Sequence, residues 1–260
     1  MTRSLLIRGM IAGLIAGLLV FAAGRVFGEP QVDRAIAFEA AMDEASAKAE
    51  AAAGHAAALP EPEPVSRANQ AGLGLFTGTV IYSAAFGGLF ALVFAFAHGR
   101  VGTADARLVS LLLAAGAFLA VFLVPDLKYP SNPPAVGLPE TIGIRTELYF
   151  VMMACSIGAL VAAAAMRQRL LPGRGAWSAS LLAAGFYAAV MAVVMLLLPA
   201  VQEVPDGFDA VVLWRFRVAS IAMQFVMWAT LGLVFGALAE RVIVGRRGAP
   251  AGGRLRAATR

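Results

Sequence analysis

Six long apolar stretches dominate this chain of 260 residues. They cover residues 5–27, 71–97, 108–124, 148–166, 178–198 and 217–239. Each approaches or exceeds the roughly 20 residues with which a helix crosses a bilayer. Ala, Leu and Gly prevail in them over the alternating pattern of a membrane β-strand. With 60% hydrophobic and 14% charged residues, the chain is too apolar for a water-facing surface. The sequence therefore predicts an all-α integral membrane protein, a bundle of about six transmembrane helices, and excludes soluble enzymes and disordered proteins.

The first stretch has a second interpretation, because Arg3 and Arg8 precede an apolar run as they would in a signal peptide. The apolar core of a signal peptide is usually about 7–15 residues long, and residues 5–27 exceed that length. We therefore expect this segment to be retained as a membrane span. Cleavage would leave five spans.

Lys and Arg are unevenly distributed between the two sides that six spans define. With both termini on the inner side, 13 of the 21 Lys and Arg residues lie inside, whereas 14 of the 16 Asp and Glu residues lie outside. Because excess Lys and Arg marks cytoplasmic segments, we expect the N- and C-termini to be cytoplasmic. The formal net charge of +5 thus reflects sidedness, and no nucleic-acid partner is expected.

The rest of the chain fits one polytopic membrane domain over residues 1–245. An extracytoplasmic loop is predicted at 28–70, with an Ala- and Glu-rich tract at 31–58 that favours a helix and alternating prolines at 60–64 that favour an extended spacer. Residues 246–260 form a basic tail that is predicted to be disordered and cytoplasmic.

Small residues recur every four positions in three of the apolar stretches. The repeats are Gly9 with Gly13 and Gly17, Gly74 with Gly78, and Gly232 with Gly236. Such spacing lets helix backbones approach closely, so a compact bundle or a partner helix is expected.

The densest polar region follows the third stretch. It contains five prolines between residues 125 and 139, including Pro133 and Pro134, and we expect the helix to end at Pro125. Irregular backbone near membrane depth must be buried in protein or line a water-filled cavity. Two interpretations stay open: a rigid outer cap in which Arg145 pairs with Glu140 or Glu147, and a functional mouth.

A second polar group lies at the start of the last stretch. Ser220, Gln224 and Trp228 are spaced by four and share a helix face with Arg217. A glutamine within a span is unfavourable unless it has a partner or faces water. Gln224 therefore predicts either a hydrogen bond between helices or part of a polar seam.

Candidate metal ligands are oxygen atoms rather than sulfur or imidazole. The chain has one cysteine, Cys155, and two histidines, so a cysteine-based metal cage is excluded. Four oxygen-bearing residues at the outer mouth suit a hydrated divalent ion: Asp126, Asn132, Glu140 and Glu147. Of these, Asn132, Glu140 and Glu147 are the predicted ligands, and Arg145 and Arg217 would position them. No permanently bound cofactor is expected, and no nucleotide-binding motif is present.

Three segments carry a family resemblance: GEPQVDRAIAFE (28–39), LKYPSNPPAVGLPETIGIRTELY (127–149) and WRFRVASIAMQFVMW (214–228). With these motifs the sequence resembles the CbtA family, described as cobalt transporter subunits of bacterial membranes. The resemblance implies about five spans, cobalt uptake linked to cobalamin synthesis, and a small one-span partner, CbtB, with a histidine-rich end. A partner of that kind would explain why histidine is scarce here.

These observations predict a non-enzymatic membrane subunit of a Co²⁺ uptake system in the cytoplasmic membrane, with Ni²⁺ as a competing ion. In this hypothesis the ion loses water near Asn132, Glu140 and Glu147 and passes a seam at Gln224. One alternative is a non-conducting scaffold or sensor for a partner protein. The other is a membrane enzyme acting at the outer face with Glu140 as its base.

Overall fold

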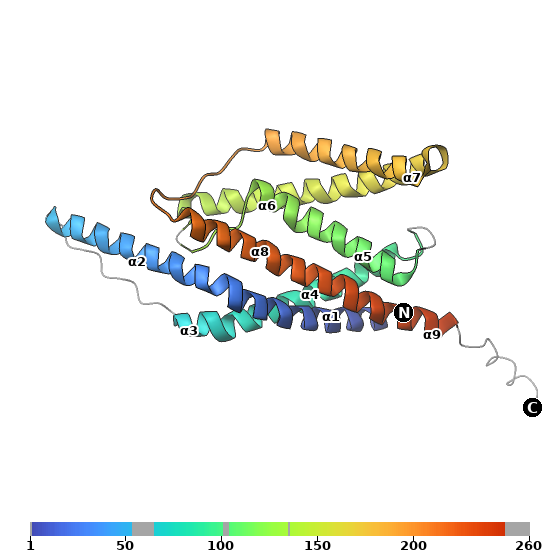
Figure 1. The fold of residues 1–260 in the computed structure, drawn as a ribbon, viewed down its shortest axis with the longest axis horizontal. Helices are drawn as coiled ribbons and strands as arrows, with labels where there is room; N and C mark the ends of the chain where they lie inside the picture. Colours follow the sequence, from blue (N-terminus) through green and yellow to red (C-terminus); the bar gives the residue numbers. More distant parts are fainter. Residues whose placement is uncertain (1, 54–64, 101–103, 135, 248–260) are drawn as a thin grey trace, which may run out of the picture. The chain divides into compact units, whose positions relative to one another are not determined.

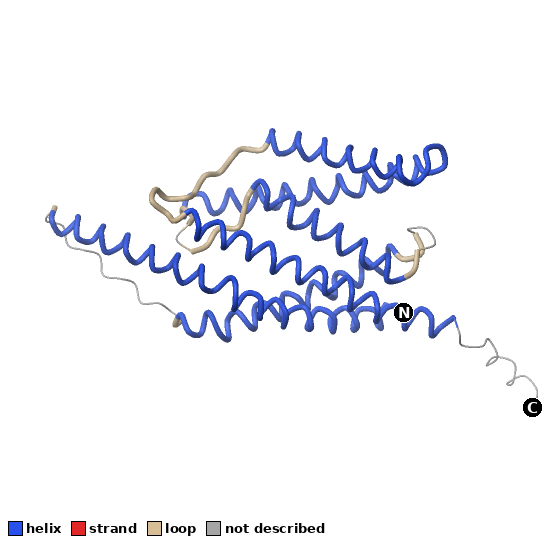
Figure 2. The backbone as a smooth tube through the Cα atoms, viewed as in Figure 1, coloured by secondary structure: helices blue, strands red, loops and turns tan. Residues whose placement is uncertain are grey.

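The structure is a computed structural model that describes residues 2–53, 65–100, 104–134 and 136–247 (Figure 1). Within these residues every regular element is helical and no strand occurs (Figure 2). Five continuous helices are long and apolar enough to cross a membrane: Thr2–Ala52, Arg67–Ala97, Ala106–Lys128, Glu140–Leu197 and Ala210–Ile243. The predicted all-α membrane protein is therefore confirmed.

Four of the helices contain a π-helical turn that joins two or more α-helical pieces. In chain order the elements are α1 (Thr2–Ala23), η1 (Gly24–Gly28), α2 (Glu29–Ala52), α3 (Arg67–Asn69), η2 (Gln70–Gly74), α4 (Leu75–Ala97), α5 (Ala106–Ala117), η3 (Phe118–Leu123), α6 (Val124–Lys128), α7 (Pro139–Leu197), α8 (Ala210–Thr230), η4 (Leu231–Phe235) and α9 (Gly236–Arg247). Prolines follow two of the π turns, at Pro30 and Pro125. A proline removes a backbone hydrogen bond, and a local change to wider winding is a common response.

Helix α7 contains two of the six predicted apolar stretches, which is why six stretches appear as five helices. Its backbone leaves the helical conformation at Gly175, where φ is 70° and ψ is 167°. The two arms then lie side by side (Figure 1), with hydrogen bonds between Ser156 and Tyr187 (2.7 Å) and from Arg167 Nε to Ser180 Oγ (2.8 Å). The positive φ at this bend favours glycine, which has no Cβ.

Several predicted boundaries need correction. The third span does not end at Pro125, because the helix continues through η3 and α6 to Lys128. The Ala- and Glu-rich tract is helical up to Ala52, as expected, but it continues the first span without a break instead of forming a separate helix in a loop. The proline spacer at 60–64 and the tail from residue 248 onward lie outside the described residues, and Arg247 still belongs to α9.

The chain divides into two compact units, and the first contains Met1–Phe21, Leu75–Ala115 and Phe225–Arg260. In it α1 and α4 cross at small residues: a Cβ built on Gly13 would approach Cα of Ala84 to 2.7 Å, and one on Gly87 would overlap the backbone of Gly9. The predicted close approach is confirmed at this repeat. At Gly78 no described atom outside its own stretch of helix lies within 4 Å of a built Cβ, so the alternative of a partner helix stays open there.

The first unit also contains an aromatic core. Phe90 and Phe94 of α4 pack edge-on against Phe235, with ring centroids 5.4 and 5.0 Å apart. Ser110 of α5 donates a hydrogen bond to the carbonyl of Gly232 (2.8 Å) in η4. These contacts are all made within the unit, where close packing and interhelical hydrogen bonds stabilise membrane helices.

The second unit contains Ala22–Gly74 and Gly116–Gln224. Its core includes Tyr129, Met152 and Met191, with alanines such as Ala159 and Ala183 where the arms of α7 meet. Arg67 of α3 forms ion pairs with Glu29 and Asp33 of α2, and thereby fixes α3 beside the start of α2.

Candidate functional site

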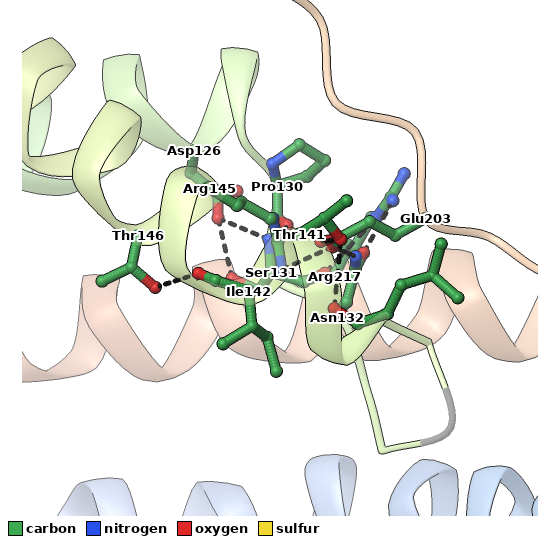
Figure 3. A network of polar contacts seen from close by, with 11 residues as sticks. Asp126, Pro130, Ser131, Asn132, Thr141, Ile142, Arg145, Thr146, Glu203 and Arg217 are labelled. Atoms are coloured by element: carbon green, nitrogen blue, oxygen red, sulfur yellow. Dashed lines mark hydrogen bonds and ion pairs between the residues drawn. The ribbon is translucent and has the colours of Figure 1, made fainter.

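A network of eight polar side chains lies in the second unit, and we call it the polar cluster (Figure 3). Its members come from the end of α6, the irregular segment that follows it, the first turns of α7, the segment between α7 and α8, and α8 itself. They are Asp126, Ser131, Asn132, Thr141, Arg145, Glu203, Arg217 and Ser220.

Glu203 joins three other members of the cluster. Its side chain is only 1% exposed and forms an ion pair with Arg145 (Nη1 to Oε2, 3.1 Å). The hydroxyl of Thr141 donates to Oε1 (2.6 Å) and the amide of Asn132 donates to Oε2 (3.3 Å). Both oxygens of this buried carboxylate are therefore compensated, as a buried charge requires.

The irregular segment after α6 is held by side chains from distant parts of the chain. Tyr129 donates to the carbonyl of Pro199 (2.8 Å), and Arg145 donates to the carbonyl of Pro130. Arg217 donates to Asn132 Oδ1 (3.0 Å). Burial raises the pKa of the Tyr129 hydroxyl above its usual value, so this group stays protonated and remains a donor.

A proline in α6 leaves a further carbonyl without its helical partner. Pro125 has no N–H with which to reach the carbonyl of Val121, four residues earlier. The hydroxyl of Tyr149 in α7 lies 3.4 Å from that oxygen and partly replaces the missing donor. Neighbouring helices commonly satisfy freed backbone groups in this way within membranes.

Asp126 and two serines form a continuous row of oxygen atoms. Ser131 donates from its backbone N–H (3.0 Å) and its hydroxyl (2.7 Å) to Asp126 Oδ1. The same hydroxyl lies 2.9 Å from Ser220 Oγ of α8. Beside this row is a pocket of about 260 Å³, lined by Asp126, Tyr129, Ser131, Arg145, Thr146 and Tyr149.

The structure brings only part of the predicted ligand set into the cluster. Asn132 belongs to it, but its amide oxygen already accepts from Arg217. Glu140 and Glu147 are exposed on α7 and form no hydrogen bond or ion pair with a described side chain. They are seven residues apart, about 10.5 Å along the helix, so one ion cannot bridge them.

The predicted positioning residues are better placed. Arg145 and Arg217 both reach the segment 130–132. The expected pairing of Arg145 with Glu140 or Glu147 is wrong, since Arg145 pairs with Glu203. Of the two adjacent prolines, Pro133 is buried and Pro134 is exposed.

Gln224 lies one turn after Ser220 on α8 and is partly buried. Its side chain forms no hydrogen bond with the part of the chain that the structure describes. Four residues separate the two positions, so they share a face of α8.

Asp126 belongs to the oxygen groups that the sequence places at the outer mouth, but not to the narrower ligand set of Asn132, Glu140 and Glu147, and Glu203 belongs to neither. The sequence offers one weak signal for each. Asp126 directly follows Pro125 at the end of an apolar stretch, and Glu203 is the first acid after the fifth stretch. Among the described residues no group of three His, Cys, Asp or Glu side chains could hold a metal ion, so any metal position here must include hydroxyl or amide oxygens.

Comparison with known proteins identifies the family. The family model described as "Probable cobalt transporter subunit (CbtA)" matches residues 2–240. The chain belongs to the CbtA family. The matched region contains nearly all of the five apolar helices and every residue of the polar cluster. No curated protein and no solved structure matches the chain. As a CbtA protein it is a multi-pass membrane protein of a family of probable transporter subunits.

Proposed function

We propose that this chain is the membrane-spanning subunit of a Co²⁺ uptake system in the cytoplasmic membrane, and that the uptake serves cobalamin synthesis. Its membership of the CbtA family over residues 2–240 is the observation that carries this proposal. The predicted acidic outer side supports it, because negative charge raises the local concentration of cations.

The exposed carboxylates of α7 are suited to collect the ion. Glu140 and Glu147 lie on one helix face and pair with no other described side chain, so their oxygens are available to a hydrated cation. Asn132 becomes a ligand only when its oxygen is released by Arg217. Gln224, further along α8, then offers an oxygen within the span.

A small partner completes the proposed system. This chain has two histidines, of which His55 lies outside the described residues and His98 stacks on Phe94 with ring centroids 5.2 Å apart. A one-span, histidine-rich subunit of the CbtB type would supply the imidazoles that capture the metal. Such nitrogen ligands bind Ni²⁺ at least as well as Co²⁺, so Ni²⁺ is the expected competitor.

Uptake of radiolabelled Co²⁺ into proteoliposomes, with and without the partner, tests the proposal. The double variant E140Q/E147Q should lower the initial rate at low Co²⁺ several-fold. The matched control is D43N/E50Q, because Asp43 and Glu50 are also exposed and seven residues apart, on α2. A wild-type rate for E140Q/E147Q would overturn the role of these carboxylates. No uptake by the wild-type pair would overturn the transport function.

The non-conducting scaffold is the second candidate, and one observation favours it. The four charged groups of the polar cluster, Asp126, Arg145, Glu203 and Arg217, sum to zero, as in a purely structural network. A scaffold predicts that the partner binds this chain with unchanged affinity while proteoliposomes take up no Co²⁺. Glu140, the base of the third alternative, an enzyme, pairs with no described titratable group.

A further inference from the structure

Asp126 is a buried carboxylate whose position the proposed function does not use. The residue is 5% exposed and belongs to α6, two residues before the helix ends at Lys128. It nevertheless lines the pocket of about 260 Å³ beside the oxygen row. A carboxylate that is buried in protein and yet borders a cavity can be reached by a small ligand.

The partners of Asp126 are neutral. Both of its hydrogen bonds come from Ser131 and end on Oδ1. Oδ2 accepts no hydrogen bond from a described residue, and no Lys or Arg nitrogen of the described chain forms an ion pair with Asp126 within 4.0 Å. Glu203 differs in this respect, because it is paired with Arg145. A buried charge without a close counter-ion is unfavourable, and a bound cation would compensate it.

One hydroxyl oxygen contacts this carboxylate, and a second hydroxyl, from another element, lies beside the first. Ser131 Oγ is 2.7 Å from Asp126 Oδ1 and 2.9 Å from Ser220 Oγ. A hydroxyl can rotate its hydrogen away and present a lone pair to a cation. Carboxylate and hydroxyl oxygens together suit a divalent cation that keeps part of its water.

We propose that Asp126 and Ser131, which line the pocket, form a binding position for a divalent cation together with Ser220, whose hydroxyl lies beside that of Ser131. The identification of that cation as Co²⁺ rests on the proposed function. The exposed Glu140 and Glu147 would meet the hydrated ion first, and Asp126 would hold it where part of its water is lost. Gln224, one turn beyond Ser220 on α8, continues the series of oxygen atoms.

The surrounding charges set the expected strength of binding. Arg145 is neutralised by Glu203, whereas Arg217 donates only to neutral acceptors, Asn132 Oδ1 (3.0 Å) and the carbonyl of Ser131 (3.4 Å). The positive charge of Arg217 therefore weakens cation binding at Asp126. Weak binding is what a transport position requires, because an ion that enters must also leave.

Calorimetric titration of the full-length protein in nanodiscs with CoCl₂ tests the position directly. D126N should lower the affinity for Co²⁺ by about tenfold or more, and S220A by a smaller factor. D206N is the matched control, since Asp206 is exposed in the segment between α7 and α8 and loses the same charge. Thermal unfolding and gel filtration establish that each variant is folded.

The outcomes separate this inference from the proposed function. Wild-type affinity in a folded D126N protein overturns the inference, and if D126N does not fold, wild-type affinity in S220A overturns it. An equal loss in D206N, or no Co²⁺ binding by the wild-type protein, also overturns it. Binding that depends on Asp126 without any Co²⁺ uptake by the wild-type pair supports the position and refutes the transporter. If D126N keeps both the wild-type uptake and the wild-type affinity, the transport function is supported and the binding position at Asp126 is refuted.

Discussion

Glu203 shows how much a single side chain contributes to the irregular part of this protein. Its carboxylate joins Asn132, Thr141 and Arg145, which belong to the segment after α6 and to the start of α7. Since the Glu203 side chain is 1% exposed, the ion pair with Arg145 is shielded from water on the carboxylate side. Removing one partner of such a pair leaves an uncompensated buried charge.

We expect E203Q to lower the free energy of unfolding by about 3 kcal/mol, because the Arg145 guanidinium then lacks its counter-ion. Unfolding in mixed micelles of increasing SDS content measures this change. E140Q makes the same chemical change at an exposed position and should stay within about 0.5 kcal/mol of the wild type. Equal stability of the two variants would contradict the structural role of Glu203.

The residues of the cluster were only partly predictable from the sequence. Arg145, Arg217 and Asn132 stand out because they lie in unusual polar motifs next to apolar stretches. The partner of Arg145 does not stand out, since Glu203 lies 58 positions further along the chain. Local spacing favoured Glu140 and Glu147, and only tertiary structure selects among acids that are distant in sequence.

At the scale of elements, helix α7 depends on one residue for its shape. Gly175 adopts φ 70° and ψ 167°, a region of backbone conformation that is essentially restricted to glycine. The arms on either side place Ser156 beside Tyr187, so the bend also determines which side chains meet. Gly173, two residues earlier, has no positive φ, and no described atom outside its own stretch of helix lies within 4 Å of a built Cβ.

We expect G175A to destabilise the protein by about 1–3 kcal/mol, because alanine is strained in this conformation. G173A is the matched control and should be neutral or stabilising by up to about 1 kcal/mol, since alanine is the better helix former. Thermal unfolding of both variants in one detergent compares them. A G175A variant as stable as G173A would refute the bend.

The sequence predicted the helices more reliably than their ends. All six apolar stretches are helical, because length and hydropathy alone determine that property in a membrane. The predicted end at Pro125 is wrong because the π-helical turn η3 precedes the proline and lets the helix continue past it. The hydroxyl of Tyr149 also lies near the Val121 carbonyl, which has no N–H of Pro125 to accept from. Such compensation depends on a neighbouring helix and leaves no local signal.

At the scale of the whole molecule, the distribution of charge predicts which side of the membrane each end of α7 faces. The bend at Gly175 follows Arg167, Arg169 and Arg174, and Lys and Arg are retained on the cytoplasmic side. The arm from Ala176 to Leu197 contains 22 residues, about 33 Å of helix and enough to cross the hydrocarbon core. The segment with Asp206 should then face the opposite side.

Cysteine labelling tests this orientation. In a C155A background, which removes the only cysteine, D206C should react with a membrane-impermeant maleimide in intact spheroplasts. R174C should react only after the membrane is permeabilised. The reverse pattern would mean that the positive-inside distribution does not set the topology of this chain.

The polar segment at 129–132 also has a consequence for the order in which the protein is made. Arg145, which donates to the carbonyl of Pro130, follows that residue by 15 positions in the chain. Ser220, which contacts Ser131, follows it by 89 positions. At about 5–20 residues per second, translation of those 89 residues takes roughly 4–18 s. During this time Arg217 and Ser220, which contact Ser131, have not yet been synthesised. Helix α8, which carries Arg217 and Ser220, is therefore the element that completes this network.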